Sequence, residues 1–174
     1  MKTLMVKAVV TSAVAAILGG VFIGSAQAQD SDKGTLKVEK PIRIKIGGFF
    51  PSEGDSDTLF HAGIAYDIAK TKATNPLVYG AFLDYYGKDG NSLFGLGGTI
   101  RGYFTPAVAM TRFYGGVGLG AYFADSDGGG NETNFGGKLF AGVELNQGFF
   151  GEVDYVYPGT NRAAGIGASV GYRF

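Results

Sequence analysis

Charged side chains recur at alternate positions in segments that are otherwise apolar and rich in glycine. Five are basic and five are acidic: Arg43, Lys45, Arg101, Lys138 and Arg173 against Asp67, Asp84, Glu144, Glu152 and Asp154. Alternate residues of a β-strand point to the same side. Equal numbers of opposite charges on one face predict a network of ion pairs, because a charge removed from water needs a partner. We therefore interpret these residues as a structural polar network.

The sequence offers little for catalysis or for metal and cofactor binding. It has no cysteine and a single histidine, His61, which excludes thiol chemistry and zinc sites built from cysteine or several histidines. The acidic clusters at 55–57 and 125–127 do not complete an EF-hand loop. The glycine-rich run 95–98 is not a phosphate loop, because no helix follows it. We expect no catalytic residue, no metal and no cofactor.

Charge and composition restrict the class of protein further. The formal net charge is zero, with 15 basic and 15 acidic residues, which argues against a nucleic-acid binder. The chain has 31 glycines without a collagen repeat, and its 14 Phe and 10 Tyr are too many for a disordered chain. This combination favours closely packed β-structure.

Eight segments with a period of two must position the charges. They cover 42–50, 60–68, 77–86, 94–104, 113–123, 135–145, 149–157 and 164–174. Turn-forming residues join them at 51–58, 69–76, 87–91, 105–111, 125–134, 146–148 and 158–162. An even number of such strands is typical of outer-membrane barrels. We predict an all-β fold, an eight-stranded antiparallel up-and-down transmembrane β-barrel over 41–174, with both chain ends on the periplasmic side.

The apolar face carries aromatic residues near its ends, where a membrane barrel meets the lipid–water boundary. The expected girdles comprise Phe50, Phe60, Tyr66, Tyr85, Phe94, Phe104, Phe113, Phe123, Phe135, Phe149, Tyr157, Tyr172 and Phe174. A strand of ten residues, at about 3.3 Å each and tilted by about 40°, spans roughly 25 Å, the height of an outer-membrane apolar band. A soluble lipocalin-like barrel also alternates, but it carries charge on its outside. The girdles favour the membrane.

The first 28 residues have the three parts of a secretory signal peptide. Lys2 and Lys7 precede an almost wholly apolar run, which ends in an Ala-Gln-Ala cleavage box. Cleavage is expected between Ala28 and Gln29. The polar stretch 29–40 lacks periodicity, so we expect a flexible N-terminal leader ahead of the barrel.

Residues 42–174 resemble small eight-stranded outer-membrane proteins of the OmpA/OmpX type. The resemblance rests on the alternating segments, the girdles and the terminal Gly171-Tyr172-Arg173-Phe174. It implies a monomer in the bacterial outer membrane, in contact with outer-membrane lipids and lipopolysaccharide. It also implies that the C-terminal strand is read by the outer-membrane insertion machinery.

Some barrels of this type are lipid A deacylases or acyltransferases. The deacylase arrangement His-x-Ser is absent, because Gly63 stands two places after His61. Ser56 and Asp57 precede His61 and could approach it, whereas the simpler interpretation is a rim or lumen histidine that bonds to Asp84 or water. We expect a structural or interaction protein with a side-chain-filled lumen. A narrow pore, a lipid-modifying enzyme and a soluble ligand-binding barrel stay open as alternatives.

Overall fold

A computed structural model describes residues 35–52, 58–88, 91–105, 110–125, 132–145, 147–159 and 164–174. These residues form nine strands: β1 (Thr35–Leu36), β2 (Ile42–Pro51), β3 (Leu59–Thr71), β4 (Leu77–Lys88), β5 (Asn91–Tyr103), β6 (Thr111–Asp125), β7 (Glu132–Leu145), β8 (Phe149–Tyr157) and β9 (Gly165–Arg173). Within these ranges no helix is long and apolar enough to cross a membrane. The expected signal peptide and the Ala28–Gln29 cleavage site lie outside the described residues.

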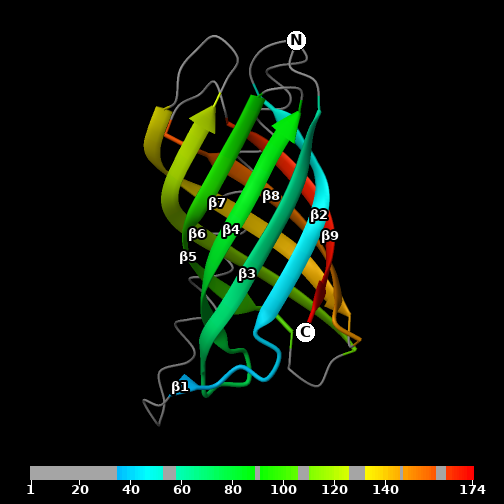
Figure 1. The fold of residues 1–174 in the computed structure, drawn as a ribbon. Helices are drawn as coiled ribbons and strands as arrows, with labels where there is room; N and C mark the ends of the chain where they lie inside the picture. Colours follow the sequence, from blue (N-terminus) through cyan, green and yellow to red (C-terminus); the bar gives the residue numbers. More distant parts are fainter. Residues whose placement is uncertain are drawn as a thin grey trace, which may run out of the picture.

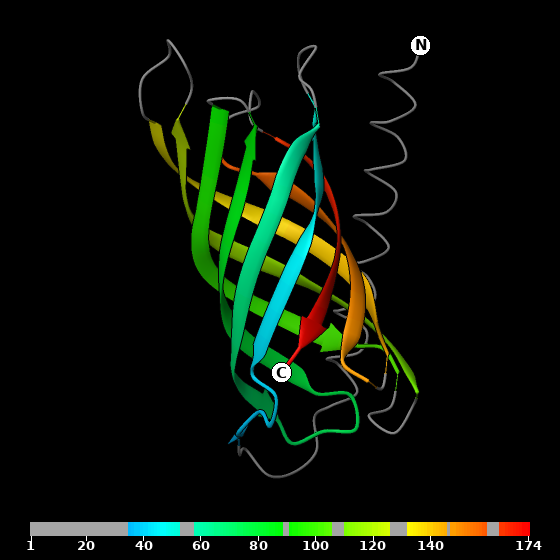
Figure 2. The same ribbon diagram turned by 45° about the vertical axis from the view of Figure 1, so that its right-hand side comes forward.

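Strands β2 to β9 close into a ring. Each pairs antiparallel with the next in sequence, and β2 also pairs with β9 along a register that runs from Arg43 opposite Arg173 to Pro51 opposite Gly165. Figures 1 and 2 show the tilted strands around one axis, with the C-terminus beside the start of β2. The predicted eight-stranded antiparallel barrel is confirmed.

Alternation decides which face of each strand points inward. In β2, Arg43 and Lys45 are buried, whereas their neighbours Ile42, Ile44 and Ile46 are exposed. Because successive side chains of a strand point to opposite faces, a strand with this pattern has a polar inner face and an apolar outer face. The same pattern in the other strands gives a barrel that is apolar outside and polar inside.

Several strands run further than the alternation predicts. The turn predicted at 69–76 is wrong in its first three residues, because β3 continues to Thr71 past a register irregularity between Asp67 and Ala69. A β-bulge of this kind inserts a residue and breaks the alternation without ending the strand. The loop predicted at 87–91 is also largely wrong, because Lys88 pairs with Asn91.

At the same end of the barrel, the loop predicted at 125–134 is wrong at both of its edges. Asp125 still belongs to β6, and β7 begins at Glu132. Ladder hydrogen bonds use backbone groups, so polar residues can continue a strand beyond the apolar band. Ala164, predicted on the outer face, is instead buried just before β9, and its carbonyl accepts a 2.7 Å hydrogen bond from the Ser52 amide.

A tight hairpin joins β7 to β8, as predicted for 146–148. Gly148 has φ +94°, a left-handed conformation that glycine adopts without steric cost. Its amide donates a 2.9 Å hydrogen bond to the Leu145 carbonyl.

The end of the expected leader is held against the barrel. Thr35 and Leu36 form β1, which pairs with Thr71 and Lys70 at the end of β3. Val38 follows and is only 2% exposed. The Arg173 side chain donates to the Lys40 carbonyl at 2.7 Å. Residues 35–40 therefore differ from the expected flexible leader, because apolar burial and strand pairing fix them; residues 29–34 lie outside the described ranges.

Candidate functional site in the barrel lumen

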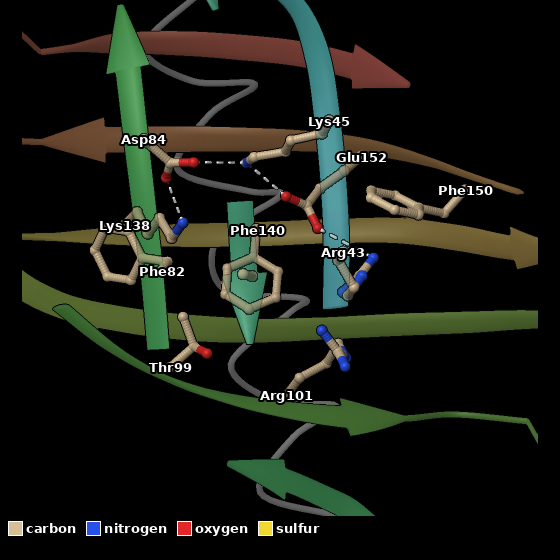
Figure 3. A pocket seen from close by; sticks show the side chains of 11 residues that line it. Arg43, Lys45, Phe82, Asp84, Thr99, Arg101, Lys138, Phe140, Phe150 and Glu152 are labelled. Atoms are coloured by element: carbon tan, nitrogen blue, oxygen red, sulfur yellow. Dashed lines mark hydrogen bonds and ion pairs between the residues drawn. The ribbon is translucent and has the colours of Figure 1, made fainter. Parts of the chain in front are cut away.

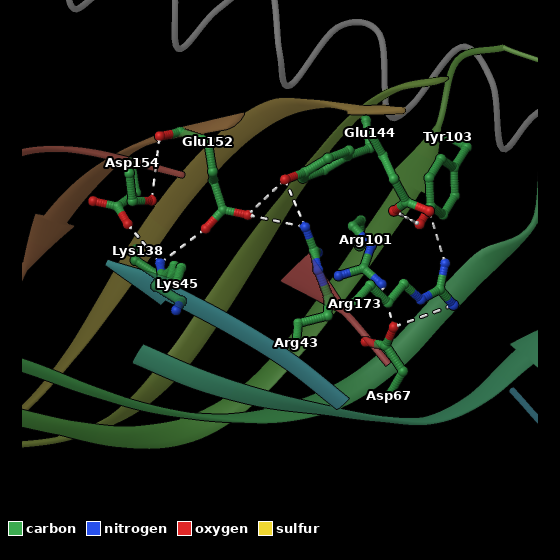
Figure 4. Close-up of polar contacts among 12 residues, drawn as sticks. Arg43, Lys45, Asp67, Arg101, Tyr103, Lys138, Glu144, Glu152, Asp154 and Arg173 are labelled. Carbon is green, nitrogen blue, oxygen red and sulfur yellow. Dashed lines mark hydrogen bonds and ion pairs between the residues drawn. The ribbon is translucent and has the colours of Figure 1, made fainter. Parts of the chain in front are cut away.

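Lys45 is the centre of the ion network in the lumen. Its ammonium donates hydrogen bonds to Glu152 Oε1 at 2.8 Å and to Asp154 Oδ2 at 3.0 Å, and it lies 3.6 Å from Asp84 Oδ1. Figure 4 shows Lys45 on β2 reaching Glu152 and Asp154 on β8. One cation therefore joins carboxylates from two other strands, β4 and β8.

Asp84 receives a second cation from across the barrel. The Lys138 ammonium donates to Asp84 Oδ2 at 2.6 Å and lies 3.7 Å from the centre of the Phe82 ring. Tyr86 donates a longer hydrogen bond, 3.4 Å, to the same carboxylate oxygen. The Phe82 ring also stabilises the Lys138 ammonium, because the face of an aromatic ring attracts a cation.

A second group of ion pairs lies nearer the end of the barrel where β9 finishes. Arg101 pairs with Asp67 at 2.5 Å. Arg173 pairs with Glu144 at 2.9 Å and lies 3.7 Å from Asp67. Glu144 also accepts a 2.9 Å hydrogen bond from the Tyr103 hydroxyl.

Arg43 and Tyr114 lie between the two groups, because the Arg101 guanidinium of the second group lies 5.5 Å from the centre of the Tyr114 ring. The Arg43 guanidinium donates to the Tyr114 hydroxyl at 2.6 Å, and that hydroxyl donates to Glu152 Oε2 at 3.0 Å. Arg43 itself lies 3.7 Å from the same carboxylate oxygen, and the Phe150 ring covers its guanidinium at 4.0 Å. Each of the predicted network residues therefore has an ion-pair partner of opposite charge, and nine of them are buried while Arg173 is 13% exposed.

Tyrosine side chains belong to this network although the sequence analysis left them out. Tyr103 and Tyr114 bond to the carboxylates, and Tyr86 is buried beside Asp84. Arg112 was also missed, and its guanidinium lies 3.7 Å from the centre of the Tyr103 ring. All four occupy the alternate positions of their strands that point into the lumen, and the alternation in the sequence would have identified them.

Aromatic clusters close the lumen on both sides of the ion pairs. One contains Val38, Val78, Tyr103, Tyr114, Phe140 and Phe150. The other contains Phe49, Phe82, Tyr86, Leu93, Tyr122 and Val156. Between them is a cavity of about 20 Å³, bordered by charged and aromatic side chains (Figure 3). This space suits about one water-sized particle.

His61 lies in the lumen and has no exposed surface. Its ring stacks on Tyr86 with centroids 4.4 Å apart, and Nε2 lies 3.5 Å from Asp84 Oδ1. Ser56 and Asp57, which could have approached it, lie outside the described residues. Among the residues that the structure describes, no group of three His, Cys, Asp or Glu could hold a metal.

The outer surface carries the predicted aromatic residues. All of them are exposed except Tyr172, which packs edge-on against Phe149 and Phe174 with ring centroids 4.9 Å apart. Strand register gathers them into rows, since Phe94 pairs with both Tyr85 and Phe123. Between the rows lie exposed aliphatic residues such as Leu96 and Leu119. Hydrophobic residues therefore cover the part of the barrel that a bilayer would surround.

Solved structures with the same architecture show which fold this is. Neisserial surface protein A aligns with a TM-score of 0.61 and 19% identity, covering 81% of this chain and 98% of its own. The chain has the fold of a small outer-membrane β-barrel. The outer membrane enzyme PagL aligns with a TM-score of 0.53 and 16% identity, covering 76% of this chain and 97% of its own. The N-terminal barrel domain of Pseudomonas aeruginosa OprF aligns with a TM-score of 0.51 and 19% identity, covering 78% of this chain and 98% of its own.

In sequence, no family model matches the chain and no curated protein matches it. The fold is shared with outer-membrane proteins, and the exposed apolar belt is the surface that such a location requires. The chain therefore combines the fold of an outer-membrane barrel with an apolar outer belt.

Proposed function

We propose that this protein has a structural or interaction role in the outer membrane and that its lumen does not conduct. The filled lumen supports the proposal: the ion pairs lie between two aromatic clusters, and the cavity bordered by both ion pairs and aromatic rings is about 20 Å³. An eight-stranded barrel has an interior only wide enough for side chains. Any partner specificity then belongs to the connections outside the membrane.

Planar-bilayer recording of the purified barrel tests the closed lumen. We expect no steady conductance above the bare membrane. Large, steady single-channel currents from pure protein would instead establish the narrow pore as the function.

An enzyme is the second candidate, because one solved structure of the same fold is that of the outer membrane enzyme PagL. The only histidine of this chain is buried in the lumen and stacked on Tyr86, out of reach of a lipid on the outside. We therefore expect no deacylation when purified protein is incubated with lipid A. Activity that His61→Ala abolishes would support the enzyme.

The C-terminal strand is the proposed contact with the insertion machinery. Phe174 is exposed at the end of β9, and its amide donates to the Ile42 carbonyl at 2.9 Å. Because this hydrogen bond uses only the backbone, a substitution of the side chain can leave the pairing of β2 with β9 intact. We expect Phe174→Ala to reduce insertion in cells but to refold normally into detergent. Phe149→Ala, at the same rim, is the control and should insert normally. Equal insertion of both variants would contradict this assignment.

Processing and assembly state follow from the same proposal. Removal of a signal peptide would give a mature protein that begins at Gln29, which N-terminal sequencing of the membrane fraction tests. A folded monomer in contact with lipid and lipopolysaccharide should migrate at a different position in unboiled and boiled gel samples. Recovery of the mature chain as a soluble periplasmic protein would overturn the membrane assignment.

A further inference from the structure

Three arginines in the lumen each have an unused hydrogen-bond donor. The Nε–H groups of Arg43, Arg101 and Arg112 are buried and have no hydrogen-bond partner within the part of the chain that the structure describes. Arg43 and Arg101 are only 4% and 3% exposed. A buried donor without a partner costs free energy, and a charged one costs more. These groups therefore need an acceptor that the protein itself does not supply.

Two of these arginines border the same cavity. Arg43 and Arg101 both line the space of about 20 Å³, and both lie over the Tyr114 ring, at 4.7 and 5.5 Å from its centre. Figures 3 and 4 both place the two guanidinium groups near each other. Thr99, whose hydroxyl can donate a hydrogen bond, also lines the cavity.

The charges around this cavity are not balanced. Four of the lining residues are cationic and two are anionic: Arg43, Lys45, Arg101 and Lys138 against Asp84 and Glu152. Over the whole described lumen, the five carboxylates of the network face its five cations and also Arg112, which packs on the buried Tyr103. One positive charge is therefore in excess, and the space between the arginines favours an anion over a cation.

We propose that the lumen binds one chloride ion between Arg43 and Arg101. Chloride accepts hydrogen bonds in several directions, it is small enough for this cavity, and it neutralises the excess charge. A water molecule could accept one of the hydrogen bonds but would leave the charge excess unchanged. In a lumen closed on both sides, such an ion is a structural part of the barrel and does not pass through it.

Urea unfolding in detergent micelles tests the proposal, with sodium chloride, bromide or gluconate at equal ionic strength. A ligand that binds only the folded barrel should slow unfolding by a factor that grows with the ratio of its concentration to its dissociation constant. We expect chloride and bromide at about 100 mM to slow unfolding roughly tenfold relative to gluconate, and to slow it further as the concentration rises.

Two variants separate a bound ion from a general salt effect. Arg101→Lys keeps the charge opposite Asp67 but removes the Nε–H donor, so the chloride effect should fall several-fold. Arg173→Lys is the matched control, because Arg173 does not line the cavity and its Nε–H already donates to the Lys40 carbonyl at 2.7 Å. This control should keep the full chloride effect.

Crystals grown in bromide give a readout that does not depend on either variant folding. We expect an anomalous peak between Arg43 and Arg101. The proposal is overturned if wild-type unfolding is the same in chloride and gluconate, if both variants lose the effect equally, or if the cavity contains only a peak of water without anomalous signal.

Discussion

Lys45 and Glu152 lie 107 positions apart in the chain, yet the Lys45 ammonium donates a 2.8 Å hydrogen bond to Glu152 Oε1. Lys45 belongs to the first strand of the ring and Glu152 to the seventh. Because β9 alone separates these strands, the pair connects the two sides of the seam through the lumen. The lumen therefore links β2 to β8 across the seam that the β2–β9 ladder closes.

Lys45→Met should strongly destabilise the barrel. It leaves Glu152 and Asp154 without their closest cation in a lumen that holds little water. Removal of one partner from a buried ion pair typically costs about 3–5 kcal/mol. Equilibrium unfolding in urea measures the loss, with the exposed Lys37→Met as control. A Lys45→Met barrel as stable as the control would show that the network is dispensable.

Leu119→Arg tests whether the outer surface meets lipid. Leu119 is 62% exposed and lies in β6 between the exposed aromatic residues Phe113 and Phe123. Arginine near the middle of the apolar band costs about 2–4 kcal/mol in a membrane barrel, but little on a water-exposed surface. Refolding equilibria in lipid vesicles give the difference. Asp125→Arg, at the end of β6, is the control and should refold as the unmodified protein does.

Gly97 is expected to tolerate no side chain, whereas the adjacent Gly98 should tolerate one. A Cβ on Gly97 would lie 2.7 Å from the Gly120 Cα on the neighbouring strand, but a Cβ on Gly98 would meet only the Gly80 carbonyl oxygen at 3.8 Å. Overpacking of this kind typically costs about 1–3 kcal/mol. Gly97→Ala should therefore melt at a lower temperature in a heat-shift gel, and Gly98→Ala should not. Equal melting of the two variants would contradict this contact.

Val38→Asp should release the segment before β2. Val38 is buried in the aromatic cluster with Tyr103, Tyr114 and Phe150, and an unpaired carboxylate there is strongly disfavoured. We expect trypsin to cut after Lys37 at least about tenfold faster, since a cost of 1.4 kcal/mol is already tenfold in the fraction released. The exposed Glu39→Asp serves as control. Slow cleavage of both variants would mean that Val38 does not hold the segment.

Alternation in the sequence was sufficient to predict the ring and the inward-facing charges. It specifies a face for every residue of a strand, so Arg43 and Asp154 could be placed in the lumen without knowing their partners. Pairing depends on the register and stagger of strands that are distant in sequence, and the alternation does not contain that information. Lys45 contacts three carboxylates for this reason, and no sequence spacing indicates which three.

Two features had no periodic signal at all. Val38 is an apolar residue in a mostly polar stretch, and only its contact with the aromatic cluster of Tyr103, Tyr114 and Phe150 makes it a buried residue. The irregularity between Asp67 and Ala69 breaks the alternation where β3 in fact continues. Both depend on tertiary contacts, which outweigh local pattern at the ends of elements.

The pairing of β2 with β9 also has a consequence for the timing of biogenesis. Export that starts with the amino end would deliver β2 to the periplasm early and β9 last. Until Arg173 reaches its place opposite Arg43, β2 keeps an unpaired row of backbone donors and acceptors, the kind of edge that recruits other chains. We therefore expect such a chain to depend on a holding chaperone during that interval, and early truncation should leave a product that aggregates rather than a smaller barrel.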